Sequence, residues 1–576
     1  MDCKEKILSQ EYVDGIVDFP VERVIREGDD ICYIKLSDRY YVAYQNRQLS
    51  PDLSESTYQY QYVPKLYGLM QTDEGTIVPN NVFDPSALVS SGIRQLQGQP
   101  LNLRGQGVVI AIIDTGIDYT NEAFIDANGE SRILAIWDQT VQEGTAPEGF
   151  YFGAEYTRED INRALASTDP GAIVPTTDPL RHGTIMAGIA AASAVGGASR
   201  YIGAAPEADI VVVKLKEAKQ YLREYYFVPE EVPAYQENDI MLGIAYANRF
   251  AIDFQRPVVI CLGIGTNMGD HAGNSLLGRY MNDMALQRSR AIVVCGGNEG
   301  IANHHYTWHF PIQGESVVEY RDVEIRVGEG ERGFWLEFWG SQPDVFNISV
   351  RSPGGETIPS IRLGIEQINT YRFIFEDTEV TVQSVLVEPG SGEEFILFRF
   401  MAPTPGIWTF RVTTVGEVHN GTFHMWLPIT QFLNSTTYFL EASPDTTITE
   451  PAMAAEIICV TNYNHVNNSF YLESGRGFSR TEKIRPDFAA PGVNVPTLYG
   501  NRTGSSLSAA ITAGGVAQFM QWAVVEGNSP LAESREVRNY FIQGAVRMPG
   551  RTYPNREWGY GALNVLGVFE RLRGDV

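Results

Sequence analysis

The feature that most constrains this chain is a series of short, largely apolar segments separated by helical patterns. Val108–Ile113, Val258–Leu262 and Ala291–Cys295 are apolar almost without interruption, and Thr184–Ala192 predicts a helix rich in small residues. A strand with one solvated face alternates polar and apolar residues, whereas a strand covered on both faces is apolar throughout. The sequence therefore predicts an α/β fold, in which a mostly parallel sheet carries helices on both faces.

Changes in residue pattern along the sequence divide the chain into three regions. We expect an N-terminal α+β region over residues 1–80 with a linker to about 85, an α/β region over 86–309 and 456–576, and an inserted region over 310–455. The inserted region has short aromatic and β-branched runs, such as Phe334–Trp339, separated by turns rich in Pro and Gly. Such runs are typical of an antiparallel β sandwich or jelly roll. We expect their aromatic side chains in its core, with a carbohydrate or peptide platform as the alternative.

Composition and charge exclude several classes of protein. The chain has 576 residues, 44% of them hydrophobic, and its 44 basic and 70 acidic residues give a net charge of −26. A chain this acidic repels phosphate backbones, so we expect no nucleic-acid partner. The N-terminal residues lack the apolar core of a secretory signal, and no run of about 18 apolar residues occurs. We therefore expect a cytoplasmic protein without a membrane span.

Cysteines and histidines predict neither a disulfide framework nor a metal site. The five cysteines are odd in number and form no CxxC pair, which indicates reduced thiols in a reducing compartment. His304, His305 and His309 lie close in sequence but have no acidic or Cys neighbour, so a polar junction loop is favoured over a metal site. We expect no cofactor and no metal.

Four polar residues stand at the ends of predicted strands or at the starts of predicted helices. They are Asp114 in Asp-Thr-Gly, His182 in Arg-His-Gly-Thr, Asn298 in Gly-Gly-Asn-Glu-Gly and Ser506 in Gly-Ser-Ser. Each alone has a structural explanation, as a turn residue or a helix cap. Together they supply a hydroxyl nucleophile, an imidazole that can take its proton, a carboxylate to orient the imidazole and an amide donor for an oxyanion. The set indicates nucleophilic catalysis.

The order Asp, His, Asn, Ser with these local sequences resembles the subtilisin-like serine proteases, the subtilases. Further similar segments are Gly203-Ala-Ala-Pro206, Arg485-Pro-Asp-Phe-Ala-Ala-Pro-Gly492 and Gly559-Tyr-Gly-Ala-Leu-Asn-Val565. The resemblance implies a serine endopeptidase acting on proteins or peptides, with Asp114, His182 and Ser506 as the catalytic triad and Asn298 as oxyanion donor. It also implies that Leu262 and Gly263 bind the substrate backbone. Nothing in Lys216–Asn238, where subtilases build much of their groove, matches the family.

The serine segment is most similar to that of the Csp germination proteases and related subtilases of spore-forming anaerobic bacteria. Ser505, Ser508 and Ala510 replace the residues usual in other subtilases, and Leu66–Met70 resembles the join between prodomain and protease in that branch. The resemblance implies a jelly-roll insertion and a spore-associated location. The substrate it implies is the zymogen of a spore cortex hydrolase.

The same resemblance implies that residues 1–80 are a prodomain, which is a partner of the enzyme, assists its folding and is cut off by the enzyme itself. Some members of the branch keep the cut prodomain bound. Its C-terminal tail would lie in the active-site cleft as a product-like strand. The cut is expected within about 71–86, and the bond just after Gln71 is one candidate.

Two alternatives remain open. Because some members of the branch are inactive, the chain could be a catalytically weak sensor or scaffold that acts by binding proteins. The inserted region could recruit a partner protein, or it could clamp the catalytic region and stabilise it.

Overall fold

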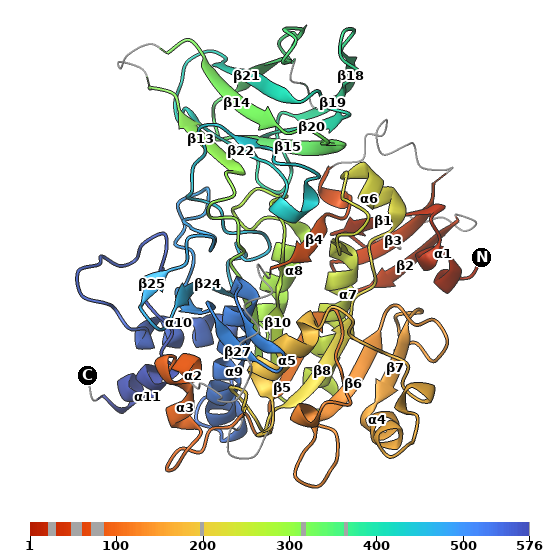
Figure 1. The fold of residues 1–576 in the computed structure, drawn as a ribbon, viewed down its shortest axis with the longest axis vertical. Coiled ribbons are helices and arrows are strands. Elements are labelled where there is room, and N and C mark those ends of the chain that lie inside the picture. The colour runs from red at the N-terminus through yellow and green to blue at the C-terminus, as the bar shows by residue number, and fades with distance from the viewer. Residues whose placement is uncertain are drawn as a thin grey trace.

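The computed structural model describes residues 1–20, 30–47, 60–70, 86–195, 201–312, 318–361, 364 and 367–574. Its centre is a mostly parallel sheet with the order β25-β24-β12-β10-β5-β8-β6-β7, in which β26 also pairs with β24 (Figure 1). The strands are β5 (Val109–Asp114), β6 (Ile133–Asp138), β7 (Ala154–Thr157), β8 (Asp209–Lys214), β10 (Val258–Leu262), β12 (Arg290–Cys295), β24 (Ile458–Asn464), β25 (Ser469–Phe470) and β26 (Phe488–Pro491). Only the edge strands β7 and β25 run antiparallel to their neighbours.

Helices cover both faces of this sheet, which explains why its strands are apolar throughout. On β5, Ile110 and Ile112 share a core with α5 (His182–Ala191) and α9 (Ser505–Met520). The alternate residues Val109, Ala111 and Ile113 share the opposite core with α7 (Glu237–Asp253) and α8 (Leu276–Ala285). Successive strand residues point to opposite faces, so both sets must be apolar. The predicted fold class is confirmed.

The described residues form further α-helices. They are α2 (Ser86–Ser90), α3 (Ile93–Leu96), α4 (Arg158–Leu165), α6 (Gln220–Tyr225), α10 (Ser534–Gly544) and α11 (Val565–Arg573). None of the helices in the described ranges is long and apolar enough to cross a membrane.

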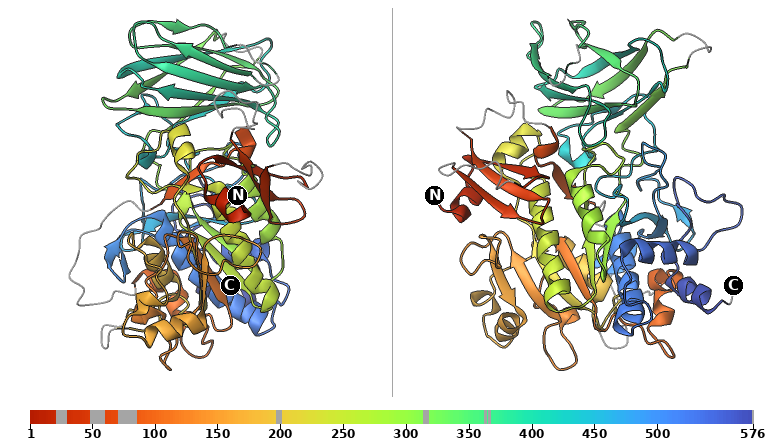
Figure 2. Two further views of the ribbon diagram at one scale, coloured as in Figure 1. Left: turned by 90° about the vertical axis from the view of Figure 1, so that its right-hand side faces the viewer. Right: turned by 180° about the vertical axis from the view of Figure 1, so that it is seen from behind.

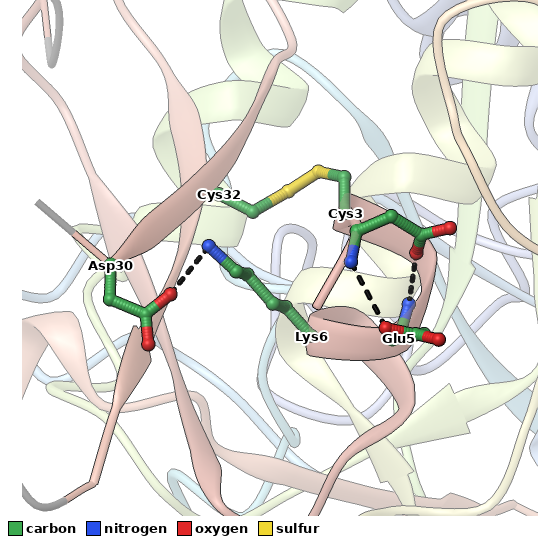
Figure 3. The surroundings of a disulfide bond; sticks show 6 residues. Cys3, Glu5, Lys6, Asp30 and Cys32 are labelled. Carbon is green, nitrogen blue, oxygen red and sulfur yellow. Dashed lines mark hydrogen bonds and ion pairs between the residues drawn. A yellow bond between two sulfur atoms is a disulfide. The ribbon is translucent and has the colours of Figure 1, made fainter. Parts of the chain in front are cut away.

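The N-terminal region has one helix packed on an antiparallel sheet. The helix α1 (Cys3–Leu8) lies against the sheet β1-β3-β2, whose strands are Tyr12–Val17, Tyr41–Asn46 and Ile31–Lys35. Cys3 and Cys32 form a disulfide between α1 and β2, beside the ion pair of Lys6 with Asp30 (Figure 3). The expectation that all cysteines are reduced is therefore wrong for this pair. Their Cα atoms lie 5.5 Å apart although 29 residues separate them in the chain, a proximity that only folding creates.

The inserted region is a sandwich of antiparallel sheets that stands above the central sheet (Figure 2). One sheet has the order β13-β22-β15-β20-β19-β18 and the other β17-β16-β21-β14-β23. Their strands are β13 (His305–His309), β14 (Arg321–Val327), β15 (Gly333–Gly340), β16 (Phe346–Arg351), β17 (Thr357–Ile358), β18 (Gln367–Arg372), β19 (Glu379–Val385), β20 (Glu394–Met401), β21 (Gly406–Thr414), β22 (Thr422–Trp426) and β23 (Tyr438–Phe439). We call residues 305–439 the β module.

Strand β15 shows that the β module is packed on two sides. Phe334 and Phe338 point into the core of the sandwich, as expected. Trp335 and Trp339 point the other way and belong to the core that continues into the α/β region. Tyr60 of the N-terminal region packs edge-on against Trp339, at 6.5 Å between ring centroids. The expectation that all these aromatics lie in the core of the module is therefore wrong for the two tryptophans, because a second layer covers the outer face of the sheet.

Candidate active site

The carboxyl end of β5 and the starts of α5 and α9 bring three predicted site residues together. Asp114 is the last residue of β5, His182 the first of α5 and Ser506 the second of α9. His182 Nδ1 lies 2.7 Å from Asp114 Oδ1, and His182 Nε2 lies 3.1 Å from Ser506 Oγ. A carboxylate, an imidazole and a hydroxyl thus form a continuous hydrogen-bonded chain.

Burial and charge act in opposite directions on the imidazole. His182 is 1% exposed, and burial by itself would lower its pKa. The negative charge of Asp114, its hydrogen bond and the more distant Asp178 outweigh burial, so the pKa of His182 is raised above its usual 6.5. The site therefore stabilises the imidazolium that forms when His182 accepts a proton.

Asp178 holds the strand end and the helix start in place, and the sequence analysis missed it. One carboxylate oxygen accepts a hydrogen bond from Thr115 Oγ1 at 2.7 Å. The other accepts from the backbone N–H of Thr184 at 2.9 Å and from its hydroxyl at 2.7 Å. Asp178 thus ties the residue after Asp114 to the first turn of α5. It precedes the helix by several residues, so no local pattern distinguishes it from an ordinary loop aspartate.

Asn298 follows β12 and faces the start of α9. Its Oδ1 accepts a hydrogen bond from the backbone N–H of Ser505 at 3.0 Å, which leaves Nδ2 as the donor for another acceptor. The backbone N–H of Ser506 points at a different group, the carbonyl oxygen of Met70, at 3.3 Å. A carbonyl from the N-terminal region therefore lies beside the nucleophile candidate.

That carbonyl directly follows strand β4 (Leu66–Leu69; Figure 1). Strand β4 lies between two short strands of the α/β region. On one side β4 pairs antiparallel with β11 (Ile264–Gly265), and on the other with β9 (Tyr235–Gln236). The N–H of Met70 donates to the carbonyl of Gly263 at 2.9 Å. The segment Leu66–Met70 thus occupies the groove in the way an added peptide strand does.

The segment Leu66–Met70 contacts one of the two residues that were predicted to bind the substrate backbone. Gly263 contacts the tail, but Leu262 is the last residue of the buried strand β10, opposite Val294 of β12. The antiparallel pairing with strand β4 instead involves Ile264 and Gly265, which lie opposite Leu69 and Gly68. The prediction rested on the resemblance of Val259–Gly263 to the substrate-binding strand of subtilases, and the binding of a substrate by Leu262 and Gly263 stays a prediction.

Close packing explains the glycine at position 263. A Cβ atom there would lie 2.9 Å from His182 Cε1 and 3.1 Å from Ser506 Cβ. Any side chain would therefore push the imidazole or the hydroxyl out of position.

A pocket of about 420 Å³ continues the groove beside Leu69 and Met70. Asn298, Glu299, Ile301 and Ala302 line it from the α/β region, and Thr430 and Gln431 from the β module. Among the described residues, no cluster of three or more His, Cys, Asp or Glu side chains is arranged to hold a metal.

Where a polar junction loop was expected at residues 304–309, His305–His309 instead form strand β13, which pairs with β22. Its pairing satisfies the backbone, and all three histidines have hydrogen-bond partners, with His309 Nδ1 3.1 Å from Thr422 Oγ1. His304 Nδ1 lies 2.8 Å from Glu299 Oε2, and His305 Nε2 lies 3.0 Å from His424 Nδ1. Burial lowers the pKa of His305 to about 3, so it is neutral in this position.

Comparison with known proteins agrees with the geometry. The family model described as "Subtilase family" matches residues 105–321 and 432–561. The structure of the Clostridium perfringens CspB protease superimposes with a TM-score of 0.74 and 30% sequence identity, covering 85% of this chain and 98% of that chain. MycP1 from Mycobacterium smegmatis is a more distant structure, with a TM-score of 0.36 and 14% identity, covering 88% of this chain and 89% of that one. No curated protein sequence matches the chain.

The family match covers more than half of the chain, and the similarity to the CspB protease extends over nearly all of that protein. The chain therefore belongs to the subtilase family and is a subtilisin-like serine peptidase, an enzyme that hydrolyses peptide bonds.

Proposed function

We propose that Ser506 is the nucleophile of this peptidase, His182 its general base and acid, and Asp114 the carboxylate that orients the imidazole. The observation that carries the proposal is the hydrogen-bonded chain from Asp114 Oδ1 through both ring nitrogens of His182 to Ser506 Oγ. Ser506 Oγ attacks the carbonyl carbon of the substrate while its proton passes to His182 Nε2. The protonated imidazole then gives that proton to the leaving amide nitrogen, and water hydrolyses the acyl-enzyme by the same steps in reverse order.

Asn298 and the Ser506 N–H are proposed to stabilise the oxyanion. The carbonyl oxygen of Met70 already accepts from the Ser506 N–H, which supports this location for the negative charge. Removal of one such donor typically lowers kcat by about 10²–10³-fold. Asn298→Leu is therefore expected to slow turnover by about that factor while leaving substrate affinity largely intact.

The first substrate we propose is the chain itself. Its tail lies in the groove with the Met70 carbonyl at Ser506, which supports the bond between Met70 and Gln71 as the one attacked. The bond considered from the sequence is the next one along the chain, just after Gln71. Both residues that it joins lie outside the described ranges. Residues 1–70 would then be a prodomain that the enzyme cuts from itself and whose tail keeps occupying the groove.

Intact mass spectrometry of the wild type and of Ser506→Ala tests these proposals. We expect the wild type to separate into a fragment of residues 1–70 and the remainder, and Ser506→Ala to stay whole. Two whole chains would contradict the proposed triad. A cut elsewhere in the wild type would leave the triad standing and refute the assignment of the bond.

The physiological substrate that we propose is the zymogen of a spore cortex hydrolase. The similarity to the CspB protease and the Csp-like serine segment support this. Incubation of such a precursor with the matured wild type should give one defined cut and an active hydrolase, whereas Ser506→Ala should give neither. An uncut precursor alongside a self-cleaving enzyme would refute the substrate but not the peptidase.

A further inference from the structure

The β module reaches into the substrate groove through one short segment. Residues Ile429–Gln431 follow β22, and the turn Thr430–Phe432 lies next to the tail strand β4. Gln431 Nε2 donates a hydrogen bond to the carbonyl oxygen of Leu69 at 2.9 Å. The inserted module thus directly contacts the second residue before the proposed cut.

The same segment covers the residue before Leu69, which is Gly68. A Cβ atom on Gly68 would lie 2.2 Å from Gln431 Nε2, 2.8 Å from Gln431 Cδ and 2.8 Å from Ile429 Cδ1. Gly68 is within an extended strand opposite Gly265, a backbone conformation that any residue can adopt. Space, and not backbone conformation, therefore favours glycine here.

The wall formed by Ile429 and Gln431 has an anchored backbone, and the hydrogen bond to the Leu69 carbonyl orients the Gln431 amide. Ile429 is fully buried. The next residue, Thr430, donates its backbone N–H to Glu299 at 3.1 Å and its hydroxyl to the same carboxylate at 3.2 Å. Glu299 is itself buried and is the neighbour of Asn298 in the chain. The α/β region thus fixes the wall through the residue that follows the proposed oxyanion donor.

We propose that Ile429 and Gln431 determine specificity by restricting the third residue before the cut to glycine. The substrates of this peptidase would then be chains with glycine at that position, the Gln431 amide holding the carbonyl of the residue that follows. The inference rests on the function proposed above, because it assumes that substrates lie in the groove as Leu66–Met70 does.

The test compares glycine with alanine at position 68 in two backgrounds. In the native background, Gly68→Ala is expected to slow self-cleavage by roughly 10- to 100-fold, the range typical of overpacking a closed site. In the background Gln431→Ala with Ile429→Val, which removes the three atoms that the Cβ would meet, the same substitution is expected to slow it by less than about 3-fold. Gly98→Ala is the matched control, since a Cβ there would meet only the carbonyl oxygen of Gln95, at 3.9 Å. Equal slowing in both backgrounds would overturn the proposal.

A second measurement does not depend on turnover. In full-length Ser506→Ala chains, hydrogen exchange of the Leu66–Met70 amides reports how firmly the tail occupies the groove. Gly68→Ala should accelerate this exchange at least about 10-fold in the native wall and much less in the opened wall. If the wild type fails to cut itself but Gly68→Ala still accelerates exchange more in the native wall than in the opened wall, the proposed catalysis is refuted and the glycine subsite is supported. Exchange that is unaffected by Gly68→Ala would refute the subsite whether or not the enzyme cuts itself.

Discussion

A buried ion pair between the N-terminal region and the α/β region allows a quantitative prediction. Lys219 Nζ lies 2.5 Å from Asp14 Oδ1 and also donates to the carbonyl of Tyr12 at 3.0 Å. The other oxygen of Asp14 accepts from Gln236 Nε2 at 2.7 Å and from Asn238 Nδ2 at 3.3 Å. The Asp14 and Lys219 side chains are 0% and 4% exposed, so water screens neither charge.

Removal of one partner should weaken docking of the N-terminal region strongly. Lys219→Met leaves the Asp14 carboxylate buried without its counter-charge, which typically costs about 3–5 kcal/mol. The N-terminal region would therefore detach from the α/β region roughly 100- to 5,000-fold more often. The double variant Asp14→Asn with Lys219→Met buries no charge, so it should recover most of this loss. The reason is that charge burial, and not the lost contact itself, carries the cost.

Hydrogen exchange measures this opening. The amides of β4 and β9 bond to each other across the interface, so their exchange in Ser506→Ala chains reports undocking without self-cleavage. Lys35→Met is the control, because it breaks an ion pair with Asp38 that lies at the surface. If Lys219→Met accelerates exchange of the β4 and β9 amides by less than about 3-fold, the reasoning is refuted. Faster exchange in the double variant than in Lys219→Met would refute it as well.

Four further results are expected. Asp114→Asn should slow self-cleavage by about 10⁴-fold, because the amide favours the wrong tautomer of the imidazole; a slowing below about 10-fold would contradict that role. Because protonated His182 cannot act as base and its pKa is raised, the self-cleavage rate should fall as the pH drops through a value above 6.5, and a pH-independent rate would argue against His182. Burial raises the pKa of Glu337 from 4.5 to about 7, so its contribution to stability is full below about pH 4.5 and is lost as the pH rises through 7. Between those pH values the free energy of unfolding of the wild type should fall by on the order of 3 kcal/mol more than that of Glu337→Gln. Parallel pH profiles of the two proteins would contradict a raised pKa of Glu337. Unfolded, unreduced protein should take up three equivalents of a thiol reagent and reduced protein five, since Cys3 and Cys32 are paired; five before reduction would disprove the disulfide.

The sequence determined the central sheet and the location of the candidate site. Strands buried on both faces must be apolar throughout, so uninterrupted apolar segments of the sequence are enough to predict β5, β10 and β12. Asp114, His182 and Ser506 each stand where a strand ends or a helix begins, and in a parallel sheet these points gather at one edge. Their proximity therefore follows from local patterns combined with one general rule of topology.

Only the tertiary structure decided which segments far apart in the chain meet. The tail pairs with Ile264 and Gly265 and not with Leu262, because register depends on how the tail strand packs in the groove and leaves no mark in either local sequence. Gln431 reaches Leu69 across 362 residues of chain. Local patterns report whether a side chain is buried, and the identity of its neighbours is fixed by packing. The disulfide and the contacts around Gly68 depend on such neighbours, so only the folded chain shows them.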